Sequence, residues 1–448
     1  MKNTLLSGAI AALLAGPAMA QTATLDDIQK EIAEMKAKNE RLEAEVEYLK
    51  ENAKAERKDI ANKSVTLDTL SASASKYTWN GDFRYRGEFI TRANDNLPTS
   101  DEHTQNRDRI RVRFGVTAKV NDTITAKLQL ATNGGTSASP SNDPRSTNQT
   151  IGEGWTRKGI SIDQAYVDWK ATSFMNLQLG KTPLPWATTA SYFWDKDITP
   201  EGAALKFSQG IFFGGVYYDW LNERSSFVNS GVRSDSKLVA AQFGIKQPIG
   251  KTALTAAVGY FDVRNVQNEI VATATGCTPN GTFFNNSANG NTTITSAGCT
   301  VLASGFATIN AFVQYDFNVG KFPMSAFVDY MKNNDAEINT VVNKKLDDAL
   351  AVGVTFNKAS AAKSWDASLV YEKNAKDSIF GEFVDSDFAA GATDGKGWSI
   401  KANYVPATNW TIGATYFINK INYDGVASTA TSFDLDYKRL QLDLNYKF

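Results

Sequence analysis

Apolar and polar residues alternate one by one in many segments between Tyr77 and the C-terminus. In Arg109–Val120 the apolar members include Ile110, Val112 and Phe114, and mainly Arg, Gly and Thr lie between them. Side chains of a β-strand point alternately to its two faces, so this period of two predicts strands with one apolar and one polar face. The pattern recurs at 81–89, 307–317, 398–404 and 410–418. Residues 77–448 are therefore predicted to form an all-β domain.

The connections between these segments alternate in length. Short turns are expected at 121–122, 208–210, 318–321 and 406–409. Long loops are expected at 91–105, 133–159, 221–236, 265–304, 333–345, 374–396 and 420–432. This alternation is typical of membrane barrels, in which short periplasmic turns and long external loops join an even number of strands, here about 16 antiparallel ones. Because a spanning strand needs only ~9–11 residues, a mean hydropathy of −0.32 is compatible with a membrane.

The last segment of the chain has the same alternation and stops on an aromatic residue. Leu444, Tyr446 and Phe448 share its apolar face. A barrel closes only when its last strand pairs with its first, because an open edge in lipid leaves backbone groups unsatisfied. A terminal Phe behind alternating apolar residues also resembles the signal that the outer-membrane barrel assembly machinery recognises. The alternative is an ordinary C-terminal strand of a soluble protein.

Residues 1–20 have the pattern of a secretory signal peptide. Lys2 is followed by the apolar stretch Leu5–Leu14, and Ala18-Met19-Ala20 forms a cleavage site before Gln21. The alternative is a buried N-terminal helix. Export and a barrel together predict the outer membrane of a Gram-negative cell, in contact with membrane lipid and lipopolysaccharide.

The two cysteines of the chain, Cys277 and Cys299, flank a stretch rich in Gly, Asn, Thr and Ser. In an oxidising compartment such a pair predicts one disulfide that pins a long loop. Two thiols without a neighbouring His make a poor metal site, so we expect no metal and no cofactor.

Residues 21–62 show the heptad pattern of a coiled coil, expected in the periplasm. Apolar residues recur at alternating steps of three and four, and Glu and Lys fill the other positions. The seam includes Ile28, Ile32, Met35, Asn39, Leu42, Val46 and Leu49. β-Branched residues at a with Leu at d favour two strands, whereas barrel pores of this size are commonly trimers, and we expect a homotrimer. A single amphipathic helix lying on another surface is the alternative. Residues 63–76 are predicted to be a linker.

A barrel of about 16 strands leaves an aqueous channel, unlike one of eight. The sequence offers one segment that could narrow it, Thr182–Pro200, which contains three prolines and a charged run. The candidate constriction residues are Lys181, Trp186, Trp194, Asp195, Lys196, Asp197 and Glu201.

Several short motifs around this segment resemble a known family. They are Gly180–Trp186, Pro200-Glu201-Gly202, Ser161–Trp169, Asn142-Asp143-Pro144 and Ser146–Thr150. Together they resemble the "putative porin" family of Gram-negative outer membranes, over most of residues 77–448. The resemblance implies passive diffusion of small hydrophilic solutes and ions. General porins fold their third loop into the channel, which implies the same for Thr182–Pro200. The layout of coiled coil and barrel is similar to phosphate-selective porins in architecture only.

Strand parity places a set of basic residues on the polar face of adjacent strands, namely Arg84, Arg86, Arg109, Arg111, Arg113, Lys119 and Lys127. A basic wall opposite an acidic loop would produce a field across the channel and favour anions. The alternative is that the arginines pair with Asp82, Glu88 and loop carboxylates and merely line a wet wall.

Other function classes have little support. The net charge of −1 argues against a nucleic-acid partner, which needs a basic surplus. An outer-membrane hydrolase needs a His base beside its nucleophile, and His103 is the sole His, so we expect no enzyme. A structural anchor, with the coiled coil reaching towards peptidoglycan, is the alternative to a pore.

Overall fold

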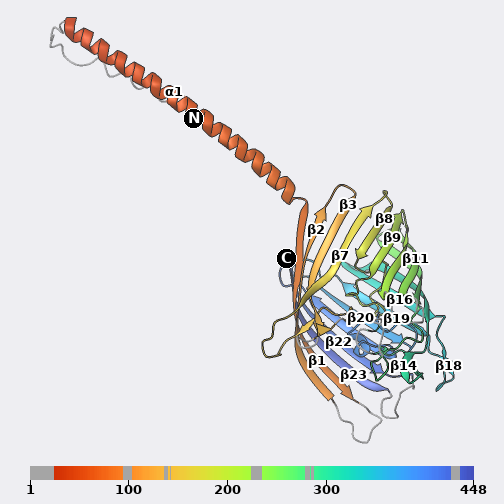
Figure 1. The fold of residues 1–448 in the computed structure, drawn as a ribbon. Coiled ribbons are helices and arrows are strands. Elements are labelled where there is room, and N and C mark those ends of the chain that lie inside the picture. The colour runs from red at the N-terminus through yellow and green to blue at the C-terminus, as the bar shows by residue number, and fades with distance from the viewer. Residues whose placement is uncertain are drawn as a thin grey trace. The chain divides into compact units, whose positions relative to one another are not determined.

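The computed structural model describes residues 25–93, 103–135, 140–141, 143–222, 235–277, 283, 287–424 and 434–448. The predicted signal peptide, residues 1–20, lies outside the described residues. The chain divides into two units, one before and one after Ser75. The first is a helix and the second a barrel (Figure 1).

The first unit is one long helix, α1 (Leu25–Ala74). Asp26 and Asp27 lie in its first turn, where negative charge stabilises a helix N-terminus. The helix does not stop before the predicted linker but continues through it, since residues 63–74 contain neither Pro nor Gly. Its apolar seam is exposed in the single chain, with Ile32 46% and Leu49 58% exposed. Among the described residues, no helix is long and apolar enough to cross a membrane.

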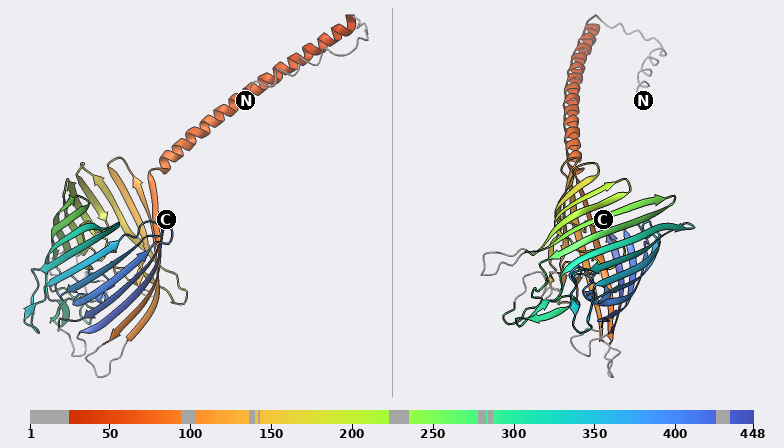
Figure 2. Two further views of the ribbon diagram at one scale, coloured as in Figure 1. Left: turned by 180° about the vertical axis from the view of Figure 1, so that it is seen from behind. Right: turned by 90° about the vertical axis from the view of Figure 1, so that its right-hand side faces the viewer.

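The second unit is a closed antiparallel barrel of 16 strands. The strands are β1 (Tyr77–Ala93), β2 (His103–Lys119), β3 (Ile124–Thr132), β7 (Ile160–Lys170), β8 (Met175–Lys181), β9 (Glu201–Gln209), β10 (Phe212–Asn222), β11 (Ser236–Ile249), β12 (Thr252–Arg264), β15 (Phe306–Val319), β16 (Phe322–Asn333), β19 (Asp348–Asn357), β20 (Trp365–Asn374), β21 (Gly395–Tyr404), β22 (Trp410–Ile421) and β23 (Leu435–Lys447). Figure 2 shows them from two further sides. The predicted fold class is confirmed.

The remaining elements are short and belong to the long connections. They are β4 (Gly134–Gly135), β5 (Pro140–Ser141), β6 (Gln149–Thr150), β13 (Thr293–Ser296), β14 (Cys299–Leu302), β17 (Ile338–Asn339), β18 (Lys344–Lys345) and the 3-10 turn η1 (Phe388–Gly391). Short turns and long loops alternate along the chain as the sequence predicts, so the barrel has a short-turn end and a long-loop end.

The first and last strands close the barrel. In the β1–β23 pairing Asp82 is opposite Lys447, and Ala93 is opposite Asp436. The backbone of Phe448 extends this ladder by exchanging hydrogen bonds with Gly81, at 2.9 and 3.1 Å. No edge is left between the two ends of the sheet, which is the condition for a β-structure in lipid.

The outer face of the barrel is apolar, and the inner face of β1 is mainly polar. On β1 the exposed side chains are Phe83, Tyr85 and Phe89, whereas Arg86 and Glu88 are buried inside. Aromatic side chains gather outside the short-turn end, where Trp410 packs on Tyr446 (ring centroids 5.3 Å apart) and Tyr446 on Phe448 (6.1 Å). An apolar band flanked by aromatic residues is typical of membrane barrels.

Candidate functional site

The segment 182–200, here called the first inward loop, crosses the barrel interior. Thr189 and Ser191 donate hydrogen bonds to Asp329 on β16, at 2.6 and 2.9 Å. The backbone N–H of Tyr192 donates to Glu372 on β20, at 2.8 Å. At the far side, Arg113 on β2 donates to Asp197 at 2.7 Å. The loop is thus fixed to the inner faces of β16 and β20 at one end and of β2, which is far from them in the strand order, at the other.

Aromatic side chains of the first inward loop fill one side of the interior. The rings of Trp186 and Trp194 lie 5.2 and 4.8 Å from that of Phe261 on β12, and Phe193 is fully buried. The predicted constriction residues Trp186 and Trp194 are therefore part of an apolar core that holds the loop in place.

A second inward loop, residues 375–394, connects β20 to β21 and also enters the barrel interior. Its Phe383 carbonyl accepts a hydrogen bond from the N–H of Asp195 (2.8 Å), and its Asp385 N–H donates to the carbonyl of Tyr192 (3.1 Å). The ring of Phe388 stacks on that of Tyr192, with centroids 5.5 Å apart. The sequence pattern treated 374–396 as an ordinary long loop. Its aromatic content could have identified it, because a solvent-exposed loop has no use for several Phe side chains. Three of them are buried in the structure, namely Phe380, Phe383 and Phe388.

The loop between β12 and β15, residues 265–305, braces this second inward loop. Asn291 donates to the carbonyls of Lys376 and Ile379, each at 2.8 Å, and accepts from the N–H of Gly381 at 2.7 Å. The predicted disulfide is present in this bracing loop, where Cys277 and Cys299 are joined with a Cα–Cα distance of 5.6 Å.

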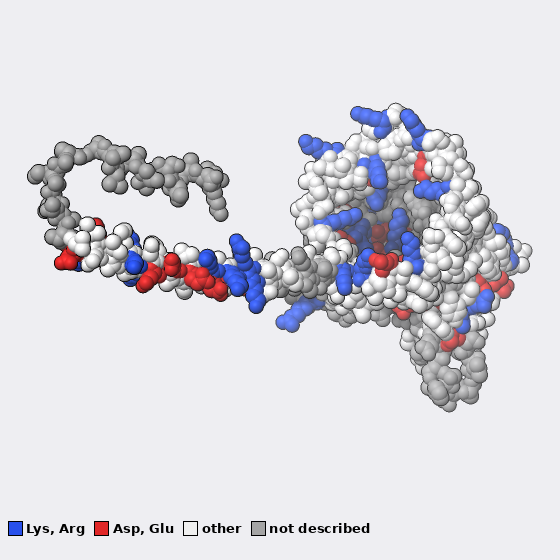
Figure 3. Space-filling view, turned by 90° about the horizontal axis from the view of Figure 1, so that it is seen from above, with Lys and Arg blue, Asp and Glu red and all other residues white. Residues whose placement is uncertain are grey.

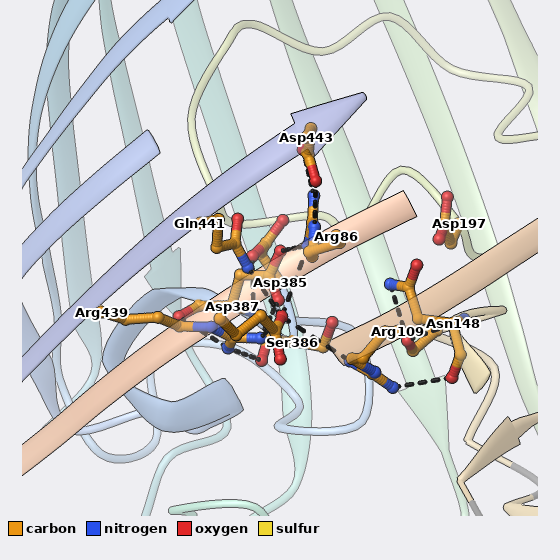
Figure 4. Close-up of polar contacts among 12 residues, drawn as sticks. Arg86, Arg109, Asn148, Asp197, Asp385, Ser386, Asp387, Arg439, Gln441 and Asp443 are labelled. Carbon is orange, nitrogen blue, oxygen red and sulfur yellow. Dashed lines mark hydrogen bonds and ion pairs between the residues drawn. The ribbon is translucent and has the colours of Figure 1, made fainter. Parts of the chain in front are cut away.

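A network of buried charges connects the second inward loop to the barrel seam (Figure 4). Arg86 on β1 contacts Asp443 on β23 at 2.6 Å and Asp387 in the loop at 2.9 Å. Arg439 on β23 contacts Asp387 at 2.8 Å and also Glu88. Burial disfavours the charged form of Asp387, but Arg439 and Arg86 outweigh it and hold the pKa of that carboxyl below its usual range. Removing one partner of such a buried group costs about 3–5 kcal/mol.

The predicted arginine ladder lies on the inner face of β1 and β2, and most of its members are paired. Arg111 contacts Asp82 at 2.7 Å, Arg113 contacts Asp197 at 2.7 Å, and Arg109 lies 3.8 Å from Glu88. These contacts match the alternative in which the arginines pair with Asp82, Glu88 and loop carboxylates.

Arg84 differs from its neighbours. Its guanidinium donates to the side chain of Asn148, and no carboxylate lies within 4.0 Å of it among the residues that the structure describes. The alternation of residues along the strand did not distinguish Arg84 from the other arginines. Their ion pairs depend on which loop carboxylates enter the barrel.

Two predicted lysines of the inner wall have different positions. Lys119 is at the short turn, where it pairs with Asp122 at 2.9 Å, so it lies at the rim. Lys127 follows the inner parity of β3 and has no ion pair in the described part of the chain.

The ends of the first inward loop are also paired. Lys181 contacts Glu201 at 2.7 Å, so these two predicted constriction residues fasten the base of the loop. Asp195 accepts hydrogen bonds from the N–H groups of Asp197 and Ser386, both at 2.8 Å, and Lys196 is exposed.

Between the inward loops and the wall lies a cavity of about 450 Å³, here called the charged cavity. Figure 3 looks into the hollow barrel, where Lys and Arg surround buried acidic groups. The basic residues of its lining are Arg84, Arg86, Arg145, Lys196 and Lys401, and the acidic ones are Asp195, Asp197, Asp366, Asp385, Asp387 and Asp443. Burial and the neighbouring Asp387 raise the pKa of Asp385 to about 6, and burial raises that of Asp195.

Sequence reasoning missed several residues of this cavity. Asp443 and Lys401 lie in strands that the sequence predicts, but nothing local indicates that they line a cavity beside the second inward loop. Within the described residues, no group of three or more His, Cys, Asp or Glu is arranged to hold a metal ion.

Comparison with known proteins places this geometry in context. A family model described as "Putative porin" matches residues 17–448. Similar solved structures include OprB of Pseudomonas putida (14% identity, 85% of this chain, 96% of that one, TM-score 0.49). Others are OmpT of Vibrio cholerae (13%, 83% and 97%, TM-score 0.44) and OmpF of Salmonella typhi in complex with daunomycin (12%, 83% and 97%, TM-score 0.45). Among curated proteins, none matches the sequence.

Proposed function

Because the chain belongs to the "Putative porin" family, we propose that it is an outer-membrane pore for passive diffusion of small hydrophilic solutes and ions. The observation that carries this is a closed 16-stranded barrel with an apolar outer face and a charged cavity inside it. A barrel of this size encloses more space than its own side chains fill. The two inward loops narrow that space and leave the charged cavity between them and the wall. No catalytic role is proposed.

Liposome swelling tests the proposal directly. Vesicles containing the purified protein are diluted into solutes of increasing size, from a triose to a trisaccharide. We expect swelling that falls steeply with solute size, because the inward loops leave only part of the barrel open. Swelling no faster than that of empty vesicles would favour the alternative of a structural anchor.

We further propose an anion preference. The two most exposed charges of the cavity lining, Lys196 and Lys401, are basic, whereas Asp195 is buried and Asp443 is held by Arg86. A passing ion meets the exposed charges first. Reversal potentials in a salt gradient test this. A cation preference in the wild-type protein, unchanged in a Lys196→Met/Lys401→Met variant, would contradict it.

We propose a homotrimer joined by α1. The exposed heptad seam supports this, because apolar side chains at a and d positions are stable in water only when a partner helix covers them.

The apolar outer face of the barrel supports contact with lipid and lipopolysaccharide. The terminal strand, with Leu444, Tyr446 and Phe448 on its outer face, supports recognition by the barrel assembly machinery. Contact between α1 and peptidoglycan in the periplasm, and export by residues 1–20, are further proposals.

A further inference from the structure

We propose that the charged cavity contains a binding site for a small organic carboxylate, formed by Arg84, Lys196 and Lys401. This inference rests on the proposed pore function and names the solute class that the pore retains on its way through. The three basic groups come from β1, the first inward loop and β21, and all line the same cavity.

The acidic side chains of the charged cavity all accept hydrogen bonds within the protein. Asp443 and Asp387 accept from Arg86, and Asp197 accepts from Arg113. The others accept from neutral groups: Asp366 from Asn403 at 2.7 Å and from the N–H of Ala359 at 3.0 Å, Asp195 from the N–H groups of Asp197 and Ser386, and Asp385 from those of Asp387 and Phe388. The acidic part of the lining is thus already satisfied.

The basic part is only partly satisfied. Arg86 is fully engaged by Asp443 and Asp387, but no carboxylate lies within 4.0 Å of Arg84, Lys196 or Lys401 among the described residues. Lys196 and Lys401 also have no hydrogen-bond partner in that part of the chain, and both are exposed to the cavity. Exposed ammonium groups cost little while they are hydrated, and they are ready to exchange water for an anion. The charged cavity therefore has basic groups available to bind a negatively charged ligand.

The neutral residues of the cavity lining indicate which groups the ligand carries besides its carboxylate. Ser368, Asn403, Thr415 and Asn445 line the same cavity and offer hydroxyl and amide groups. Such groups exchange hydrogen bonds with hydroxyls in both directions, since each can donate and accept. The volume of about 450 Å³ lies within the ~300–1,000 Å³ usual for small-molecule sites. A hydroxylated carboxylate, such as a sugar acid, fits both parts of the lining.

The site is tested by block of single channels in planar bilayers, with gluconate as the probe in a KCl background. We expect gluconate to interrupt the current in a concentration-dependent way. Sorbitol, which has the same polyol chain without the carboxylate, is expected to leave the current unchanged at the same concentration. In Lys401→Met and in Lys196→Met the gluconate concentration for half-block is expected to rise tenfold or more.

Lys127→Met is the matched control, because Lys127 is an inner-wall lysine that has no ion pair among the described residues and does not line the charged cavity. We expect less than a twofold change for this variant. Equal effects of Lys127→Met and Lys401→Met would overturn the site in favour of a general effect of lumen charge. Block by sorbitol, or stronger block by inorganic phosphate than by gluconate, would overturn the ligand class. A complete absence of conductance steps would instead contradict the proposed pore function, so the two failures are distinguishable.

Discussion

At the residue scale, the structure separates charges that hold the barrel together from charges that a solute meets. Arg86 and Arg439 are buried and paired with carboxylates of the second inward loop and the last strand. Lys196 and Lys401 are exposed and unpaired among the described residues. Alternation along the strands predicted that Arg86 faces inward, because side-chain direction is a local property. It could not predict the pairing, which depends on Asp387, a residue about 300 positions away.

We expect protonation of Asp385, which lines the charged cavity, to make the ion selectivity of the proposed pore depend on pH. Burial and Asp387 raise the pKa of this carboxyl to about 6, so it loses its negative charge as the pH falls through 6, well above the range of an ordinary Asp. The cavity then becomes more positive. We expect the anion-to-cation permeability ratio to rise as the pH falls from 7.5 to 5.

Reversal potentials measured at each pH check this expectation. Asp385→Asn should have the low-pH ratio at every pH, and the exposed Asp122→Asn, at a short turn, should behave like the wild type. An unchanged pH profile in Asp385→Asn would show that another group is responsible.

A substitution at Gly81 tests the packing of the terminal residue. A Cβ at position 81 would lie 2.7 Å from the carbonyl oxygen of Arg113 and would also meet the ring of Phe448. We expect Gly81→Ala to lower the stability of the folded barrel by about 1–3 kcal/mol, as overpacking generally does. Gly87→Ala is the control on the same strand, since its Cβ would lie 3.5 Å from the nearest atom, on Asp108.

Thermal unfolding in detergent, followed by circular dichroism, measures the difference between these two variants. Equal midpoints for Gly81→Ala and Gly87→Ala would contradict the proposed tight fit of Phe448 against β1.

At the element scale, the sequence predicted strands, turns and the heptad helix because each has its own periodicity. It did not predict where loops go. The first inward loop was identified only by its prolines, charges and family resemblance, and the second was missed, because a loop has no period that indicates its environment. The Ser/Ala/Lys stretch 63–76 predicts a linker, but residues 63–74 contain neither Pro nor Gly to end the helix, and α1 continues to Ala74.

Removal of the second inward loop should widen the pore. Asn374 and Gly395 are paired across β20 and β21, so a short Gly-Ser turn can replace residues 376–393 without moving either strand. We expect at least a twofold increase in single-channel conductance, because the loop and its aromatic side chains occupy the barrel interior. Deletion of the hairpin β17–β18 is the control, and a conductance like that of the wild type is expected. An unchanged conductance after removal of residues 376–393 would show that this loop does not limit the current.

At the scale of the whole molecule, closure of the barrel and association through α1 are separate properties. Closure was predictable, since a last strand with alternating residues must pair with the first in lipid. The number of chains is not fixed by the heptad alone, because its β-branched a positions favour a dimer and barrel precedent favours a trimer.

Association through the seam is tested by Leu42→Glu/Leu49→Glu, which places two charges at d positions. We expect the proposed trimer to dissociate in mild detergent while each barrel remains folded, because buried like charges are strongly unfavourable. Tyr48→Glu is the control, since Tyr48 is exposed and lies outside the seam. Size-exclusion chromatography with light scattering gives the mass. A mass that does not change in the Leu42/Leu49 variant would contradict association through α1.

Current through single molecules in a planar bilayer shows whether the closed barrel conducts. We expect discrete conductance steps that scale with salt concentration and increase when residues 376–393 are replaced. Folded protein that inserts into the bilayer but produces no steps, in the wild type and in the loop-replacement variant, would contradict it.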